Sequence, residues 1–427
     1  MLARILPFVA LCLITISASA QKPAILIKAG RLYDAEKNVF TNNQQVLIEG
    51  SKIKAVGPDL QVPAGTTVLD MPGATLTPGL IDAHTHLLLM QRASENLAVD
   101  AFLNSPERRV LRAASFARSY LESGFTAIRD LGNSGYYLDL EVASAINRGY
   151  IPGPKMWCSG PILSAIDGQF YQLPYADRVR VAEKEYRLIR GEEDAVQAVK
   201  EHVNNSVNVI KVVAFGERMG VTLAELKAIV KTAHEQHLPV TAHSTGGESL
   251  NMAIEAGVDG IEHAYYIADS LLAKMKRKGI YMVPTDPSFQ SVIEAQKSQN
   301  ITIFDTAGIR KELSPLSERL LRAHKAGVKI VAGSDAYTEL QISRGDAAKQ
   351  TIQAYVEEGL SAADALKAAT INAAEALGQK GNMGVIKPGA TADIAIFGGD
   401  LEKNFSKTLF NVSMVIKDGK IVYTKEK

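Results

Sequence analysis

The feature that most constrains this fold is an alternation of short apolar segments with helical patterns through the middle of the chain. The apolar segments have the length and composition of buried strands. Eight are found: Leu80–His86, Thr126–Asp130, Lys155–Ser159, Val209–Val213, Val240–His243, Gly260–His263, Tyr281–Val283 and Lys329–Ala332. Helical patterns between them include Pro106–Glu122, Glu192–Asn204, Leu223–Gln236 and Glu312–Ala326. These units predict an α/β fold, a (β/α)8 barrel of the TIM type. A doubly wound open sheet is the alternative, because counting units does not show closure.

Local signals mark the starts of two of these helices. Thr222 and Glu225 have the spacing of a capping box at the start of the third helix. Ser314-Pro315 is expected to begin or interrupt the fourth, because proline lacks the backbone donor that a helix interior uses.

Short β patterns stand at both ends of the chain, outside this alternating region. They are Ile25–Ile27, Gln45–Ile48 and Lys52–Val56 at the start, and Asp393–Phe397, Val412–Ile416 and Lys420–Tyr423 at the end. An Asp418-Gly419 hairpin turn joins the last two. We therefore expect residues 21–76 and 384–427 to form one small β-sandwich domain, and residues 77–383 to form the barrel.

Residues 1–20 have the pattern of a signal peptide. Arg4 provides a positive start, Ile5–Ile16 is almost wholly apolar, and Ala18-Ser19-Ala20 offers a cleavage site before Gln21. An uncleaved anchor is the alternative, although the apolar run is short for a membrane span. We expect an exported protein, periplasmic or secreted, with no stable membrane insertion after cleavage.

The composition of the mature chain excludes some partners. Once Arg4 is removed, basic and acidic residues are equal at 46 each, so no strongly basic surface points to nucleic acid. With Cys12 in the removed segment, Cys158 is the single remaining cysteine and no intramolecular disulfide can form. We expect a small-molecule substrate, and the sequence is compatible with a homo-oligomer.

Two histidines end the first predicted strand of the alternating region. Because side chains two residues apart on a strand point the same way, His84 and His86 present two imidazoles to one face. Such a pair suits a zinc-like ion. A structural pair of histidines at a strand end is the alternative.

Further ligand-type residues occupy the same position on other strands. His243 and His263 end two strands, and Asp335 follows the strand Lys329–Ala332. In a barrel the carboxyl ends of all strands meet at one face, so these side chains should converge on the first pair. The remaining histidines, His202, His234, His237 and His324, fall in helices or at their ends, where solvated or capping roles are expected.

Lys211 lies inside the otherwise apolar strand Val209–Val213. Burial presses its ammonium toward the neutral amine, which can add CO2 to become a carbamate that bridges two cations. The alternative is an amine that reaches a salt bridge along a buried stem, and the residues alone favour it.

Several motifs together resemble the amidohydrolase superfamily, in its prolidase-like and imidazolonepropionase-like branch. They are Thr77–His86, Gly124–Gly132, Asn208–Val212, Val240–His243, Gly260–His263, Ala332–Asp335 and Gly384–Asp393. The resemblance covers essentially the whole mature chain. It favours the carboxylated form of Lys211, the type of lysine found in two-metal members.

The resemblance implies a ligand set for two divalent ions, expected to be zinc. His84, His86 and Asp335 would hold the first ion, His243 and His263 the second, and carboxylated Lys211 would bridge them. The ions would share a hydroxide, and Asp335 would act as the catalytic proton carrier.

Three departures from the family pattern leave the substrate open. They are Thr245, the run Ala264-Tyr265-Tyr266 and the loop Ile162–Gln172. The substrate-binding residues are unknown, with weak candidates in Arg218, Tyr265, Tyr266 and Tyr337. Arg129-Asp130 is interpreted as a buried pair that supports the metal ligands.

We therefore expect a metal-dependent hydrolase of C–N amide bonds in dipeptides, Xaa-Pro-like ones included, or in N-acyl amino acids. A one-metal enzyme that opens cyclic amides, or a deaminase, is the first alternative, and only a two-metal site uses a bridging carbamate. A non-enzymatic exported binding protein is the second alternative, although all six ligand positions are filled.

Overall fold

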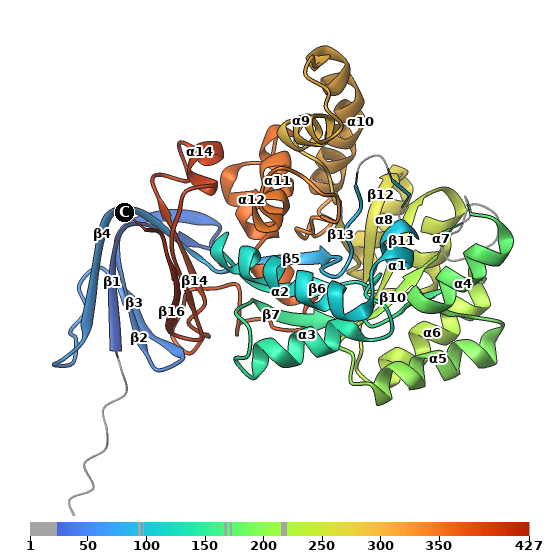
Figure 1. Ribbon diagram of the computed structural model, residues 1–427. Helices are drawn as coiled ribbons and strands as arrows, with labels where there is room; N and C mark the ends of the chain where they lie inside the picture. Colours follow the sequence, from blue (N-terminus) through green and yellow to red (C-terminus); the bar gives the residue numbers. More distant parts are fainter. Residues whose placement is uncertain are drawn as a thin grey trace, which may run out of the picture.

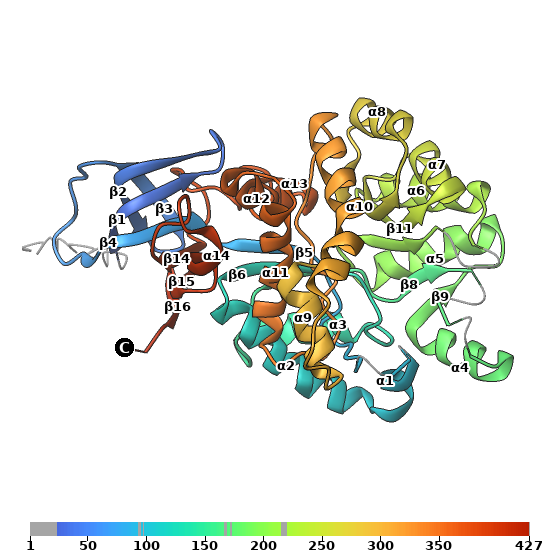
Figure 2. The same cartoon turned by 90° about the horizontal axis from the view of Figure 1, so that it is seen from above.

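The computed structural model describes residues 24–92, 95–96, 98–165, 169–170, 173–214 and 220–426. The predicted signal peptide and Arg218 lie outside these ranges. The described chain has a strand-rich part at one end and a larger α/β part beside it (Figures 1 and 2).

The strand-rich part is one sheet built from both ends of the chain. Its order is β16-β15-β14-β4-β1-β2-β3. The strands are β1 (Ala24–Asp34), β2 (Val39–Glu49), β3 (Lys52–Gly57), β4 (Thr67–Pro78), β14 (Ile394–Gly398), β15 (Val412–Lys417) and β16 (Lys420–Thr424). Strand β4, which the sequence patterns did not indicate, pairs with β1 and β14 and thereby joins the two ends.

This sheet curves until its two outer hairpins touch. Ile53 of β3 and Ile416 of β15 belong to one apolar core, although their strands lie at opposite ends of the sheet order. At the Asp418-Gly419 turn, a Cβ on Gly419 would lie 1.8 Å from the carbonyl oxygen of Gly50. The predicted sandwich is therefore a single folded-over sheet. The domain limits at residues 76 and 383 stay a prediction.

The α/β part contains parallel strands in two sheets. One has the order β5-β6-β7 and the other β13-β12-β11-β10-β8-β9. Their bounds are β5 (Leu80–Thr85), β6 (Phe125–Asp130), β7 (Lys155–Cys158), β8 (Ile162–Ser164), β9 (Tyr186–Leu188), β10 (Ile210–Val213), β11 (Val240–Gly246), β12 (Gly260–Tyr266) and β13 (Tyr281–Val283). Seven predicted strands are confirmed. From β10 to β13 neighbours in the chain are neighbours in the sheet, whereas a doubly wound sheet reverses its order.

Backbone hydrogen bonds connect the two sheets. The amide of Asn208, just before β10, donates to the carbonyl of Cys158 on β7 at 2.9 Å. At β13 and β5, Met282 of β13 donates to Lys329 at 2.9 Å, and Ala83 of β5 donates to Ala332 at 2.8 Å. The predicted strand Lys329–Ala332 thus lies between β13 and β5. It forms one bridge, Ile330 to Met282, rather than a regular strand.

Helices surround the parallel strands. They are α1 (Ala98–Leu103), α2 (Pro106–Glu122), α3 (Leu138–Asn147), α4 (Tyr175–Glu185), α5 (Glu192–Asn204), α6 (Leu223–Glu235), α7 (Gly247–Ala256), α8 (Asp269–Lys278), α9 (Phe289–Ser298), α10 (Thr306–Lys325), α11 (Arg344–Glu357), α12 (Ala362–Ala368) and α13 (Ile371–Ala376), with α14 (Phe405–Leu409) beside the curved sheet. The capping box at Thr222 and Glu225 is confirmed. Pro315 instead lies inside α10, because Asp305 caps that helix earlier.

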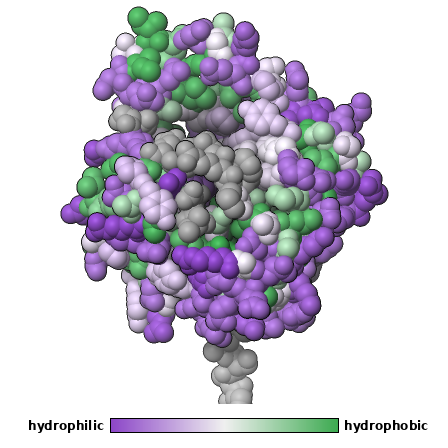
Figure 3. All heavy atoms as spheres, turned by 90° about the vertical axis from the view of Figure 1, so that its right-hand side faces the viewer, coloured by the Kyte–Doolittle hydropathy of each residue, from purple (hydrophilic) through white to green (hydrophobic). Residues whose placement is uncertain are grey.

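The described helices leave no candidate for a membrane-spanning helix. None of the described helices combines the length and the apolar character that crossing a bilayer demands. On the face in Figure 3, hydrophilic residues predominate and hydrophobic ones are scattered among them.

In Figure 1, α9 and α10 stand out from the rest of the α/β part.

Candidate metal centre

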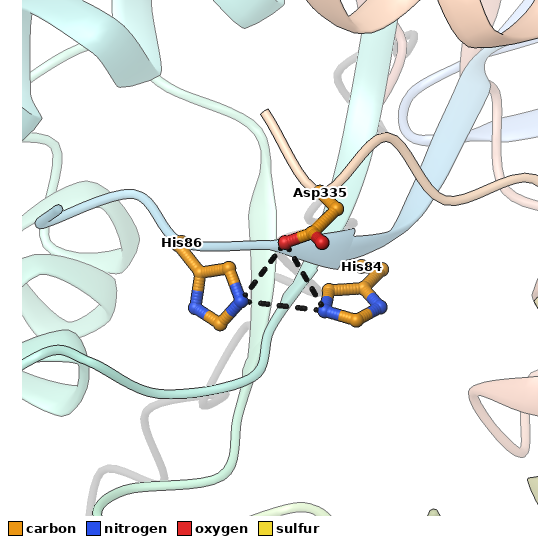
Figure 4. A group of neighbouring side chains, drawn as sticks. All are labelled: His84, His86 and Asp335. Carbon is orange, nitrogen blue, oxygen red and sulfur yellow. Dashed lines mark hydrogen bonds and ion pairs between the residues drawn. The ribbon is translucent and has the colours of Figure 1, made fainter. Parts of the chain in front are cut away.

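His84 and His86 point to one side of β5, as the period of a strand requires. Their Nε2 atoms lie 3.3 Å apart. The Oδ1 atom of Asp335 lies 3.1 Å from Nε2 of His86 and 3.5 Å from Nε2 of His84 (Figure 4). These three side chains are placed so that they could hold one metal ion.

Asp335 reaches this position because the chain turns sharply after Ala332. Gly333 packs directly on β5, where a Cβ would lie 2.6 Å from the Cβ of His84. Asp335 then adopts a left-handed backbone conformation, with φ of 51°, and its amide donates to the carbonyl of His84 at 2.8 Å. Such strained backbone conformations persist where the surrounding structure enforces them.

His243 and His263 form a second pair on β11 and β12, which both continue beyond the histidine with which the predicted strands end. Nε2 of His263 lies 2.8 Å from Nδ1 of His243. The two pairs are adjacent, because the ring centroids of His84 and His263 are 5.3 Å apart. The left-handed φ of 73° at His263 breaks the strand alternation, so neighbouring Glu262 also reaches the His84 ring.

Three of the imidazoles are held by acceptors on their outer nitrogens. Nδ1 of His86 donates to the carbonyl of Gly132 at 2.7 Å, and Nδ1 of His84 donates to Glu262 at 2.7 Å. Nδ1 of His263 lies 2.7 Å from Oγ1 of Thr285, whose hydroxyl donates to Pro284. These contacts place the protons on Nδ1 and leave the Nε2 lone pairs directed at the centre.

Lys211 of β10 is fully buried beside these rings. Burial lowers the pKa of its amine to about 8, which increases the neutral fraction at ordinary pH. Its charge also helps to lower the pKa of His84, after burial, to about 4. Among the described residues no ion-pair partner of the amine lies within 4.0 Å. The salt bridge of Lys211 that the residues alone favoured is therefore not found among the described residues.

The donor set fits a divalent cation. Oδ1 of Asp335 is buried and has no hydrogen-bond partner among the described residues. It faces the Nε2 lone pairs of His84 and His86, so a proton or a cation is needed to offset the repulsion. Imidazole nitrogens with one carboxylate oxygen are typical ligands of zinc and related ions.

A buried network that the sequence patterns did not indicate supports His84. Glu262 accepts from Nη2 of Arg129 at 3.0 Å and from the hydroxyl of Thr241. Arg129 also donates to the hydroxyl of Tyr281 at 2.6 Å. Glu262 immediately precedes a ligand histidine, but a strand pattern would turn its side chain away. Only the left-handed backbone at His263 explains its position.

The prediction that Arg129 and Asp130 pair with each other is wrong, because consecutive residues on a strand point to opposite faces. Both side chains are nevertheless buried and support the centre separately. Arg129 binds Glu262 behind His84, and Asp130 accepts from the amide of Leu87 at 2.6 Å, next to His86.

A pocket of about 350 Å³ opens beside Asp335. Tyr265 and Tyr337 both line it, as do Pro287, Val292, Ala295 and Leu340, whereas Tyr266 is 80% exposed and does not. No described lysine, arginine or histidine lines this pocket. Its size and lining suit an uncharged part of a small substrate.

One of the remaining histidines departs from expectation. His202 on α5 is fully buried rather than solvated, and its Nε2 lies 2.7 Å from the carbonyl of Pro161. His234 is half-exposed and pairs with Asp259 at 2.9 Å. Neither belongs to the group that could hold a metal ion.

Comparison with known proteins gives consistent results. The model of the amidohydrolase family matches residues 75–422. Ochratoxinase of Aspergillus niger is 29% identical over 416 residues, which is 89% of this chain and 82% of that protein. Imidazolonepropionase of Idiomarina loihiensis is 24% identical over 403 residues, 87% of this chain and 90% of that protein. The crystal structure of a Xaa-Pro dipeptidase with bound methionine in the active site superposes with a TM-score of 0.80 at 25% identity, covering 94% of this chain and 100% of that one.

Proposed function

The chain belongs to the amidohydrolase family and is a hydrolase of C–N bonds in small molecules, and from this premise we propose that it is an exported two-metal amidase. Its substrates are dipeptides, Xaa-Pro-like ones included, or N-acyl amino acids. Its parallel strands form a closed (β/α)8 barrel, and the hydrogen bonds of Asn208, Lys329 and Ala332 between the sheets support this closure.

One observation carries the proposal: two pairs of ligand-type histidines lie next to each other, with Asp335 at one pair and Lys211 buried nearby. His84, His86 and Asp335 would hold one ion. His243 and His263 would hold the other, with zinc as the expected metal because three of these rings present Nε2 lone pairs. When bound, the two ions supply an activated water and polarise the scissile carbonyl.

Lys211 is proposed to be carboxylated on Nζ. Its neutral amine would add to CO2, forming the N–C bond and releasing one proton to solvent. The anionic product would bridge the two ions. The support is the complete burial of the side chain, its lowered pKa and the absence of a described ion-pair partner.

Asp335 is proposed to move the proton of the reaction. Burial raises the pKa of this carboxyl group, but His84, His86 and Lys211 outweigh that effect and hold it below its usual value. The carboxylate is therefore ionised at neutral pH and can accept a proton from water. It can then return that proton to the leaving nitrogen of a substrate bound in the pocket that Asp335 lines.

The pocket beside Asp335 supports a small substrate with an uncharged substituent. Tyr265 and Tyr337 offer hydroxyl groups to polar atoms, while Val292 and Leu340 offer apolar contact. The relatives include an ochratoxinase, an imidazolonepropionase and a Xaa-Pro dipeptidase, so the relatives leave the substrate class open. The linear amides are preferred here because a bridging Lys211 belongs to a two-metal site.

The decisive experiment combines metal analysis with a substrate screen. Protein purified in bicarbonate is expected to bind about two zinc ions per chain and to release amine from members of a dipeptide and N-acyl amino-acid library. A chain that binds one ion and opens only cyclic amides would replace the proposal with the one-metal alternative. Release of no product from either class would remove the proposed substrates.

Export is proposed from the sequence of residues 1–20. Expression of the full chain in a bacterial host is expected to yield a periplasmic or secreted protein that begins at Gln21. Intact mass and N-terminal sequencing of each cell fraction measure this. Full-length protein confined to the cytoplasm would contradict it.

A further inference from the structure

Three of the four imidazoles point Nε2 at the centre. His243 points Nδ1 at it instead. His84, His86 and His263 direct Nε2 inward, and acceptors hold their Nδ1 atoms. His243 instead directs Nδ1 toward His263 at 2.8 Å, and its Nε2 faces outward. The outward nitrogen of His243 lies 3.4 Å from the amide nitrogen of Gln169.

Because His243 points Nδ1 at the centre, it can bind a second ion only in one of its two tautomers. A ring that ligates through Nδ1 must carry its proton on Nε2, and a buried N–H needs an acceptor. The His243 ring is partly buried, and both of its nitrogens face polar groups of the protein. In the neutral ring, the single proton lies on one of these two nitrogens.

Gln169 can form a hydrogen bond with either tautomer of His243. The oxygen and the NH2 group of its amide are similar in shape, but the oxygen accepts a hydrogen bond and the NH2 group donates one. In the present orientation, Nε2 of Gln169 faces His243, while its Oε1 accepts from the hydroxyl of Tyr186 at 3.0 Å. That arrangement places the His243 proton on Nδ1, where it can donate to His263. It suits the metal-free centre.

The reversed amide suits the loaded centre. Oε1 of Gln169 would then accept from Nε2–H of His243, and its amide nitrogen would donate to the hydroxyl of Tyr186. Tyr186 could adapt because Nδ2 of Asn133 lies 3.3 Å from its hydroxyl, and reversal of that amide gives the tyrosine proton an acceptor. The ring of His243 and the hydroxyl of Tyr186 therefore each keep a partner in both arrangements.

The neighbours of Gln169 hold it at this distance. Tyr186 is almost completely buried, and its ring packs edge-on against Phe170 with centroids 5.4 Å apart. Asn133 is buried as well, and its backbone carbonyl accepts from Arg109. Because Tyr186 and Asn133 are held in place, the amide of Gln169 can turn over while it stays next to the Tyr186 hydroxyl and the His243 ring.

We propose that Gln169 is a positioning residue, which fixes His243 in its metal-binding tautomer by turning its amide over when the second ion binds. The inference rests on the proposed two-ion function. Gln169 itself stands in the stretch 162–172, where the sequence departs from the family pattern.

The test compares zinc binding by the parent, Gln169→Leu, Gln169→Glu and Tyr186→Phe variants. Competition with a chromogenic chelator measures each affinity, and elemental analysis measures the stoichiometry. Loss of such a supporting contact typically weakens metal binding about 10- to 100-fold. Gln169→Leu is expected to weaken one ion by this factor and leave the other unchanged. Gln169→Glu, an acceptor in every orientation, is expected to retain both, and Tyr186→Phe to weaken the same ion less.

Gln353→Leu is the matched control. Gln353 is a buried glutamine of α11 whose amide donates to Ser406 at 2.8 Å, away from the centre. This control should bind both ions as the parent does. Thermal unfolding of the metal-free variants identifies any loss of fold.

Selective ¹⁵N labelling of the eight histidines gives a second measurement. Addition of zinc should move the His243 proton from Nδ1 to Nε2 in the parent, and the Gln169→Glu variant should show Nε2–H before zinc is added. Unchanged zinc affinity in Gln169→Leu, with two ions bound by the parent, would overturn this inference alone. A parent that binds one ion would overturn both this inference and the two-ion proposal.

Discussion

At the scale of single residues, the centre depends on a buried charge that touches no substrate. Glu262 is fully buried, and its charge is balanced by Arg129, which is also buried. The favourable charges of His84 and Arg129 overcome burial and lower the pKa of Glu262 to about 2. Removing one member of such a pair leaves the other charge buried without compensation.

Glu262→Gln is therefore expected to lower the free energy of unfolding by about 3–5 kcal/mol. Denaturant unfolding of the metal-free protein measures the change. Glu122→Gln is the control, because Glu122 pairs with Arg118 on the surface at 2.8 Å and such pairs contribute about 0–1 kcal/mol. Equal losses in the two variants would show that the Glu262–Arg129 pair has no special role.

Asp335→Asn is expected to lower kcat about 10²- to 10⁴-fold, because an amide cannot carry the proton between water and the leaving nitrogen. Steady-state rates on the best substrate of the screen measure the loss, with circular dichroism as a check of the fold. Glu339→Gln removes a half-exposed carboxylate that pairs with Arg92 at the surface and should leave kcat near the parent value. A fully active Asp335→Asn enzyme would exclude the proton-transfer role.

At the scale of elements, the segment after α10 both joins two sheets and delivers a ligand. Lys329 and Ala332 bond to β13 and β5, and Asp335 follows within a few residues. Gly333 makes this close passage feasible. A Cβ there would lie 2.4 Å from Cγ1 of Val283 and 2.6 Å from the Cβ of His84.

Gly333→Ala is expected to push this segment away from β5 and to weaken binding of the first ion together with stability. Gly73→Ala is its matched control, because nothing lies within 4 Å of the added Cβ and the backbone there is not left-handed. Zinc affinity and thermal unfolding of both variants measure the effect. Parent-like zinc binding by Gly333→Ala would show that the segment relaxes without moving Asp335 or His84.

At the scale of the whole molecule, the buried histidines make stability depend on pH. Burial is the largest cause that lowers the pKa of His84 to about 4 and of His243 to about 3. The unfolded chain binds these protons near the ordinary value of 6.5, so between pH 6.5 and 4 it holds more protons than the folded chain. These two histidines therefore lower the free energy of unfolding as the pH falls through this range, whereas Asp82 and Asp139, whose pKa values burial raises to about 7, act in the opposite direction.

Denaturant unfolding of the metal-free protein at pH 7 and pH 5 measures this dependence. As the pH falls from 7 to 5, the stability change of His243→Asn should be less unfavourable than that of the parent, because the variant lacks one of the sites that take up a proton on unfolding. Equal stability changes in the parent and in His243→Asn would contradict the depressed pKa of His243.

The local pattern of the sequence was sufficient for most of the parallel strands and for the direction of His84 and His86, although it did not indicate β4. Strand periodicity placed His84 and His86 on one face, and the capping box at Thr222 marked the start of α6. These features depend on residues within a few positions of one another. A single chain segment therefore contains all the information that they need.

Tertiary structure decided how these side chains are supported. The partner of Arg129 is Glu262 rather than Asp130, and the neighbour of His243 is Gln169. Such contacts join residues far apart in the chain, so they depend on which strands become neighbours and on their register. They also depend on the left-handed backbone of His263, which turns a side chain against the strand alternation. Sequence periodicity records the direction of a side chain on a regular strand, but the groups that meet it exist only after the strands have packed.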